Sequence, residues 1–163
     1  VSTLAVLADG KLVSGSRDAS VRLWDVDTGA CVVTLGHTDV VTCLAVLPDG
    51  RLASGTRDGT VRLWDVDART CVAVLTEYTG YVRALAALPD GRLAAGFKDG
   101  TVRLWDTRPA AAAGASHAVG AAPVEVVGLF GDGAGVMLAL PDGRLACGAE
   151  VSLLELPPPA AFE

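Results

Sequence analysis

Three residues, His37, Ser54 and Asp58, are of the types that form a nucleophilic catalytic triad. In such a triad a histidine takes the proton of the serine hydroxyl, and a carboxylate orients the histidine. The set raises the hypothesis of a hydrolase with Ser54 as its nucleophile. Because a nucleophile also needs a cleft and an oxyanion hole, the elements that position these residues must decide whether their role is catalytic or structural.

Two of the three residues fall in a stretch that predicts a β-hairpin. Residues 51–65 read RLASGTRDGTVRLWD, with β-type runs on both sides of Asp58-Gly59. Glycine in that place supplies the positive φ that a tight turn requires. Ser54 is therefore expected in a strand, and Asp58 in the turn that follows it.

This hairpin is one of a series. Residues 11–25 read KLVSGSRDASVRLWD, residues 92–106 read RLAAGFKDGTVRLWD, and a diverged copy at residues 144–155 reads RLACGAEVSLLE. Trp64 follows Trp24 by 40 residues, and Trp105 follows Trp64 by 41. A period of this length indicates a repeat architecture in which each copy is one supersecondary unit.

Each copy predicts four short strands, which in the second copy are residues 41–47, 51–55, 60–64 and 71–75. An Asp-Gly turn joins the first two strands of every copy, as at Asp49-Gly50. The strands are apolar on both sides, as in VTCLAVL, which favours sheets covered on both faces. We therefore predict an all-β fold of stacked sheets.

Composition limits the classes of partner. The chain has 163 residues and a net charge of −6, which argues against non-specific binding to nucleic acid. No apolar run is long enough to span a bilayer, so we expect no membrane partner either. Val1 falls inside a repeat and no initiator Met is present, so we expect the chain to be a segment of something longer.

The four cysteines show no metal-binding spacing. None forms a C-x-x-C pair, and Cys31 and Cys71 occupy the same place in successive copies. We expect them to be small buried side chains in a reducing compartment, which predicts an intracellular protein of the cytoplasm or nucleus with no metal and no cofactor.

The motifs Gly36-His37, Ser54-Gly55, Asp58-Gly59-Thr60 and Trp64-Asp65 together resemble the signature of the WD-repeat (Trp-Asp repeat) β-propeller family. The signature pair recurs as Trp24-Asp25 and Trp105-Asp106. The resemblance implies a β-propeller segment of about four blades of four-stranded antiparallel sheet, forming an incomplete ring. Its blades are residues 1–39, 40–80, 81–130 and a degenerate 131–156, followed by a tail at 157–163.

Two departures from the pattern lie in the second half of the chain. Residues 107–123 are rich in Ala, Gly and Pro and read as a loop inserted before the last strand of blade three, which resumes at residues 124–129. Blade four lacks its last strand, because prolines 157–159 cannot donate ladder hydrogen bonds. Four such blades make an open arc with apolar faces at both ends. We expect the rest of a longer chain to close it; the alternatives are closure by a second copy or poor solubility of the isolated piece.

For the triad-like set the resemblance implies a structural role. In WD-repeat blades the corresponding residues, here His37, Ser54, Asp58 and Trp64, form a buried hydrogen-bonded tetrad. Only blade two has all four members, since blade three carries Ala95 in the serine place. The hydrolase remains the alternative to a non-catalytic scaffold or adaptor for other proteins and peptides.

Two further groups are candidate binding residues. Arg17, Arg57 and Lys98 precede the turn Asp of successive blades, and the resemblance places Tyr78 and Tyr81 on the same rim. Such a rim could bind an acidic or phosphorylated peptide, although solvated turn residues give the same pattern. Trp105-Asp106-Thr107-Arg108 resembles the box by which some WD-repeat proteins dock on the adaptor of cullin-RING ubiquitin ligases, which makes Arg108 a candidate contact.

Overall fold

The computed structural model describes residues 1–75, 80–108, 125–129, 137–142, 144–147, 152–154 and 156. These residues form fifteen strands and no helix, so none of them provides a helix that could cross a membrane. The strands make four antiparallel sheets. The expectation of an all-β fold is confirmed.

Each sheet is a meander in which consecutive strands pair in chain order. The first sheet contains β1 (Thr3–Val6), β2 (Leu12–Gly15), β3 (Ser20–Trp24) and β4 (Cys31–Gly36). The second sheet contains β5 (Val41–Val46), β6 (Leu52–Thr56), β7 (Val61–Asp65) and β8 (Thr70–Leu75). The strands expected from the second copy are thus found within about one residue of their predicted ends.

The third sheet contains β9 (Val82–Ala87), β10 (Arg92–Phe97), β11 (Thr101–Asp106) and β12 (Glu125–Leu129). Because β12 pairs with β11, the expected strand after the Ala/Gly/Pro-rich segment exists and completes this sheet. The fourth sheet has β13 (Met137–Ala139), β14 (Leu145–Cys147) and β15 (Ser152–Leu154) as its described strands.

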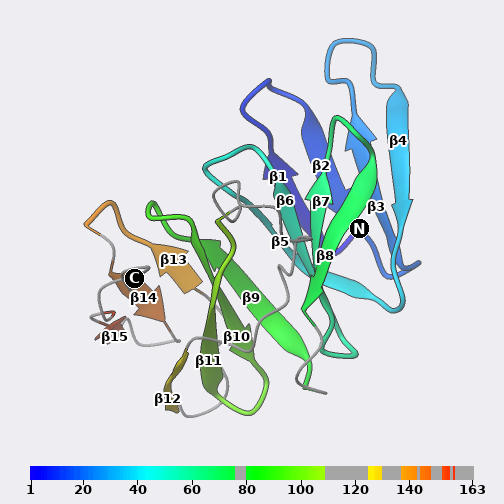
Figure 1. The fold of residues 1–163 in the computed structure, drawn as a ribbon. Coiled ribbons are helices and arrows are strands. Elements are labelled where there is room, and N and C mark those ends of the chain that lie inside the picture. The colour runs from blue at the N-terminus through cyan, green and yellow to red at the C-terminus, as the bar shows by residue number, and fades with distance from the viewer. Residues whose placement is uncertain are drawn as a thin grey trace, which may run out of the picture.

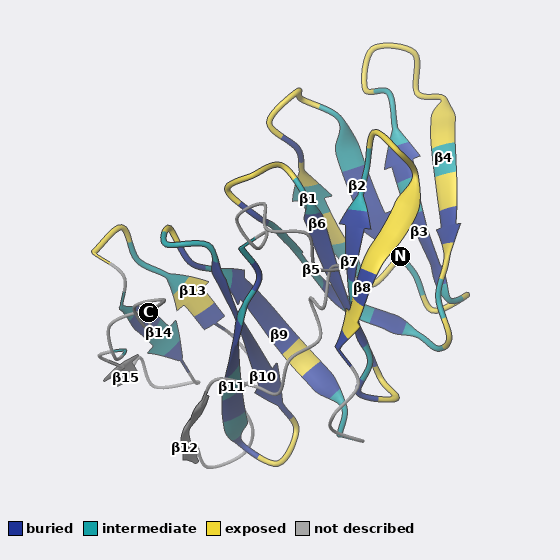
Figure 2. Ribbon diagram, in the orientation of Figure 1, coloured by how far each residue is buried: buried dark blue, intermediate teal, exposed yellow. Residues whose placement is uncertain are grey.

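The sheets stack in chain order into an unclosed arc, with the first and fourth sheets at opposite ends (Figure 1). Their first strands, β1, β5, β9 and β13, together line the concave side. Three apolar clusters fill the three junctions between neighbouring sheets, and buried residues concentrate there (Figure 2). The described part of the chain is therefore an incomplete β-propeller.

The turns between second and third strands need a left-handed residue, and the chain supplies it in two ways. Gly59 has φ 92°, where glycine has no steric penalty. In the first sheet Ala19 holds φ 61° at the equivalent place, which costs an L-residue about 1 kcal/mol. The hairpin prediction therefore holds even where the glycine is missing.

Side-chain hydroxyls link neighbouring sheets. Thr42 Oγ1 lies 3.0 Å from Gly55 O in its own sheet and 2.5 Å from Val82 O in the third sheet. Ser2 makes the corresponding contacts with Gly15 O and Val41 O in the first two sheets. The repeat thus places one hydroxyl at each of these two junctions.

One expectation was wrong. Cys31 and Cys71 are exposed, and only Cys43 and Cys147 are buried. Both exposed thiols sit at the start of an outermost strand, beside a register irregularity at Leu23/Trp24 or Leu63/Trp64. On such an edge strand only the alternate residues face the neighbouring sheet, so equivalent positions were both left in solvent.

Candidate functional site

Ser54, the candidate nucleophile, lies on β6 with its side chain fully buried. Trp64 Nε1 donates to Ser54 Oγ over 2.8 Å, and His37 Nε2 lies 3.0 Å from the same oxygen. The rings of His37 and Trp64 meet edge to face with centroids 6.1 Å apart. Three of the four expected tetrad members are therefore brought together.

The tautomer of His37 opposes a role as a base. The backbone N–H of Thr38 donates to His37 Nδ1 at 3.0 Å, which leaves the ring proton on Nε2. Nε2 then donates to Ser54 Oγ, although a general base would need an unprotonated nitrogen there. With Trp64 also donating, Ser54 Oγ accepts two hydrogen bonds inside a sheet, so its lone pairs are not available for attack.

The hydrogen bonds of the Asp58 carboxylate go mainly to the turn around it and not to His37. Its carboxylate accepts from Thr56 Oγ1 at 2.6 Å and from the backbone N–H of Thr60 at 3.0 Å. Burial raises the pKa of Asp58, but these hydrogen bonds, with one from the Thr38 side chain, outweigh it and hold the pKa well below its usual range. Thr38 links Asp58 to His37, since its hydroxyl also lies 3.4 Å from His37 Nδ1.

The other sheets carry incomplete versions of this cluster. Trp24 Nε1 donates to Ser14 Oγ over 2.8 Å in the first sheet. In the third sheet Ala95 replaces the serine, and the buried Trp105 Nε1 has no partner among the described residues. This gradation indicates that the hydrogen-bonded cluster stabilises each sheet internally. The fold forms even in sheets where one member of the cluster is replaced.

Exposed cations gather on one rim of the arc. Arg17, Arg57 and Lys98 are all exposed, each in the turn between the second and third strands of its sheet. Backbone bonds from Arg57 N to Val40 O (3.0 Å) and from Lys98 N to Tyr81 O (2.9 Å) place these turns beside the entry to the innermost strand. We call the edge that carries Arg17, Arg57 and Lys98 the basic rim.

Two more residues belong to the basic rim. Tyr81 is half-buried at its inner margin, and the exposed Arg83 lies over the Tyr81 ring at 5.9 Å. Sequence reasoning missed Arg83, although a comparison with Thr42 at the same place of the second copy could have found it. Arg57 is partly neutralised by Asp39 at 3.2 Å, and Tyr78 lies outside the described residues.

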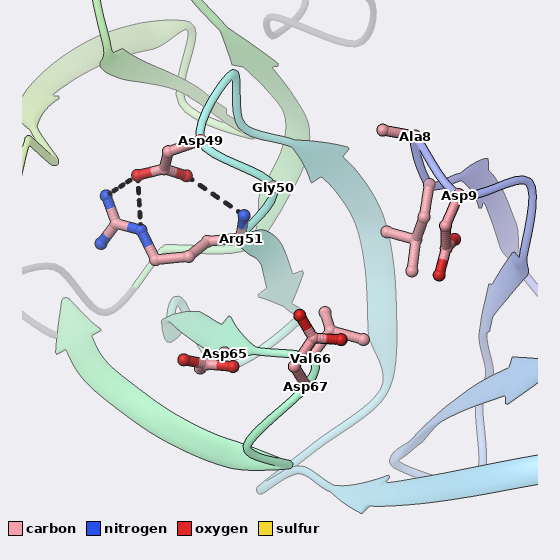
Figure 3. A pocket seen from close by; sticks show the side chains of 9 residues that line it. Ala8, Asp9, Asp49, Gly50, Arg51, Asp65, Val66 and Asp67 are labelled. Carbon is pink, nitrogen blue, oxygen red and sulfur yellow. Dashed lines mark hydrogen bonds and ion pairs between the residues drawn. The ribbon is translucent and has the colours of Figure 1, made fainter.

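The opposite rim carries a pocket between the first two sheets, with a volume of about 250 Å³ (Figure 3). Four aspartates and one arginine provide its charge: Asp9, Asp49, Asp65, Asp67 and Arg51. Arg51 pairs with Asp49 at 2.6 Å, and Lys11 pairs with Asp9. Carboxylates thus outnumber cations around this pocket, and we call this edge the acidic rim.

Arg108 lies on the acidic rim beside the third sheet. It forms a bidentate pair with Asp106, with Arg108 Nε at 2.9 and 3.1 Å from the two carboxylate oxygens. The pairing lowers the pKa of Asp106. The neighbouring Thr107 is buried and donates to Gly91 O at 2.7 Å, so the Trp-Asp-Thr-Arg segment is held against the β9–β10 turn.

The described residues contain no group of three or more His, Cys, Asp or Glu side chains that could hold a metal ion. Their surface instead offers two rims of turns carried on a stack of sheets, one with exposed cations and one with a pocket lined by carboxylates. That arrangement suits recognition of other macromolecules, since loops carried on a rigid scaffold are the usual site of binding.

Comparison with known proteins finds a family model and relatives that match this chain. The family model "WD domain, G-beta repeat" matches residues 1–25, 29–65 and 69–106. The F-box/WD repeat-containing protein 10 of Mus musculus is 56% identical over 36 residues, which is 22% of this chain and 4% of that protein. The matched segment therefore spans a small fraction of the relative's length.

Proposed function

Because this chain belongs to the WD-repeat family, we propose that it acts as a protein-binding platform in the cytoplasm or nucleus, and that its basic rim binds an acidic or phosphorylated segment of a partner protein. WD-repeat proteins generally serve as interaction scaffolds. The buried, doubly hydrogen-bonded Ser54 supports the same view, since a substrate would have no access to its hydroxyl.

The observation that carries the proposal is the periodic exposure of Arg17, Arg57 and Lys98 on one edge. Guanidinium groups match phosphate and carboxylate geometry and bind them by charge-assisted hydrogen bonds. Tyr81 and Arg83 add an aromatic ring and a further cation at the inner margin of that edge. Because the whole chain has a net charge of −6, exposed cations at one edge would favour the approach of acidic partners at that edge over other parts of the surface.

Binding of phosphorylated and acidic peptides to the chain tests this. The double variant Arg57→Glu/Lys98→Glu is expected to weaken binding by about tenfold or more, with a loss of salt dependence, because it reverses two charges that attract the peptide. The matched control is Lys11→Glu/Arg69→Glu, which makes the same charge change on the acidic rim. The exposed Arg69 lies there in the turn between β7 and β8, which also carries Asp67 of the pocket. Equal effects of the two double variants on peptide affinity would contradict a site on the basic rim.

A second candidate function is substrate reception for a cullin-RING ubiquitin ligase. It rests on the Trp105–Arg108 segment, on the partial exposure of Arg108 beside Asp106, and on a relative whose name joins WD repeats to an F-box. Pull-down of the ligase adaptor with the Arg108→Ala variant tests it, with Arg69→Ala as the control from the same rim. Adaptor capture that is unchanged by Arg108→Ala would remove this candidate.

A further inference from the structure

The first sheet repeats, residue for residue, an apolar surface that the second sheet buries. Leu4, Val6, Leu12, Trp24 and Val26 stand 40 positions before Leu44, Val46, Leu52, Trp64 and Val66, with identical residue types. The second set packs on the first sheet, against a cluster that includes Leu7, Val13, Val21, Leu23 and Leu35. The first set therefore forms the same docking surface, which we call the front face of the first sheet.

Nothing in the described residues covers this front face. Leu4 is 59% exposed, Val6 64% and Val26 61%, whereas their equivalents Leu44, Val46 and Val66 are partly buried in the junction. Large aliphatic side chains exposed together on one face of a sheet usually mark an interaction site, because burial of their apolar surface is favourable.

The three junctions between neighbouring sheets indicate what kind of surface would cover the front face of the first sheet. In each, the front face of one sheet meets the opposite, aliphatic face of the preceding sheet, which we call its back face. The back face still uncovered among the described strands belongs to the fourth sheet. It presents Leu138 on β13, which is 61% exposed, opposite Ala146 on β14.

We propose that two copies of this chain pair head to tail, with the front face of the first sheet of each copy on the back face of the fourth sheet of the other. The described residues of each copy form four sheets, so two copies of residues 1–163 make a ring of eight. Propellers close with about four to eight blades, and three copies would exceed that range, so association stops at two. This inference concerns the ends of the arc and is independent of the proposed rim function.

The mass of the chain in solution tests the proposal, measured by sedimentation over a range of concentrations. The unmodified chain is expected at twice its chain mass. Leu4→Glu and Leu138→Glu each place one charge in both junctions of the ring, so each variant alone is expected to weaken dimerisation by about a hundredfold or more. Val72→Glu, at an exposed valine on β8 of the inner second sheet, is the control and should remain a dimer.

Mixing the two variants gives the sharpest readout. One junction of the mixed pair then carries both charges, and the other is unmodified, so a discrete heterodimer is expected from two monomeric variants. Circular dichroism of each variant establishes that it is folded.

Two results would overturn the proposal. The first is an unmodified chain that is monomeric at all concentrations, which is the result expected if other blades of a longer protein cover this face. The second is a dimer that survives Leu138→Glu, because it would indicate pairing of two first sheets.

Discussion

Trp105 and Ala95 form a mismatched pair in the third sheet. The indole N–H of Trp105 is buried without a hydrogen-bond partner in the described residues, and Ala95 stands where the equivalent Trp64 finds the hydroxyl of Ser54. A buried donor that lacks its partner destabilises the fold. The chain therefore contains, in its second and third sheets, a natural comparison of the same tryptophan with and without its acceptor.

Ala95→Ser should supply the missing acceptor. We expect the free energy of unfolding to rise by about 1 kcal/mol, the net value of a typical hydrogen bond, as measured by urea unfolding. Ala94→Ser is the control, because Ala94 is equally buried but faces the fourth sheet. A new hydroxyl at that position is expected to destabilise the chain, and equal shifts in the two variants would contradict the role assigned to Trp105.

Ser54→Ala should have the opposite effect in the second sheet. It leaves the donors of Trp64 and His37 unpaired at a fully buried site, so a loss of about 2–3 kcal/mol is expected. Ser14→Ala in the first sheet removes the acceptor of the half-buried Trp24 alone, and a smaller loss is expected. Ester hydrolysis by the unmodified chain that disappeared in a folded Ser54→Ala variant would instead support the catalytic hypothesis.

The order of the strands could be predicted from sequence because it depends on local signals. The period of 40 or 41 residues fixes the sheets, and the Asp-Gly turns fix the strand ends to about one residue. The grouping of His37, Ser54 and Trp64 followed from family resemblance. What could not be predicted depends on the geometry of single hydrogen bonds, such as the one from Thr38 N–H that leaves the proton on His37 Nε2, or on local irregularities of register, such as the exposure of Cys31.

Arg83 shows the same limit at the candidate site. A cation in the first strand of a repeat can point into a junction, into the concave side or toward a rim, and a sequence pattern does not separate these. Its exposed position beside Tyr81 became evident only from the structure. The basic rim was predicted from period alone, because turn residues project outward in every copy.

Thr42→Val tests the hydroxyl that links the second and third sheets. Valine keeps the shape of threonine but removes the hydrogen bonds to Gly55 O and Val82 O, so a loss of about 1 kcal/mol in unfolding free energy is expected. Thr42→Ser retains the hydroxyl and should lose less. If Thr42→Ser were as destabilised as Thr42→Val, the methyl group and not the hydroxyl would be the important part.

Gly55→Ala tests how closely the same two sheets approach. A Cβ atom at Gly55 would lie 2.7 Å from both Cys43 Sγ and Val82 Cγ1, inside van der Waals contact. Overpacking of this kind costs about 1–3 kcal/mol, which thermal unfolding would register as a lower midpoint. Gly36→Ala is the matched control on an outer strand, with nothing within 4 Å of the added carbon, and a change below about 0.5 kcal/mol is expected there.

Acid should destabilise the second sheet through protonation of His37. This should occur at a higher pH than the protonation of the aspartates whose pKa values are lowered. Burial, with the nearby charge of Arg62, lowers the pKa of His37 to about 4, although Asp58 and Asp39 act in the opposite direction. In the unfolded chain the histidine pKa is about 6.5, so between about pH 6.5 and 4 the unfolded state binds more protons and stability falls as pH falls. Allowing for the partial exposure of the ring, we expect a loss of about 1–2 kcal/mol over that window. His37→Gln, measured by urea unfolding at each pH, should be less stable at pH 7 but should lack this part of the slope. Identical slopes in the two proteins would show that His37 has the same pKa in the folded and unfolded states.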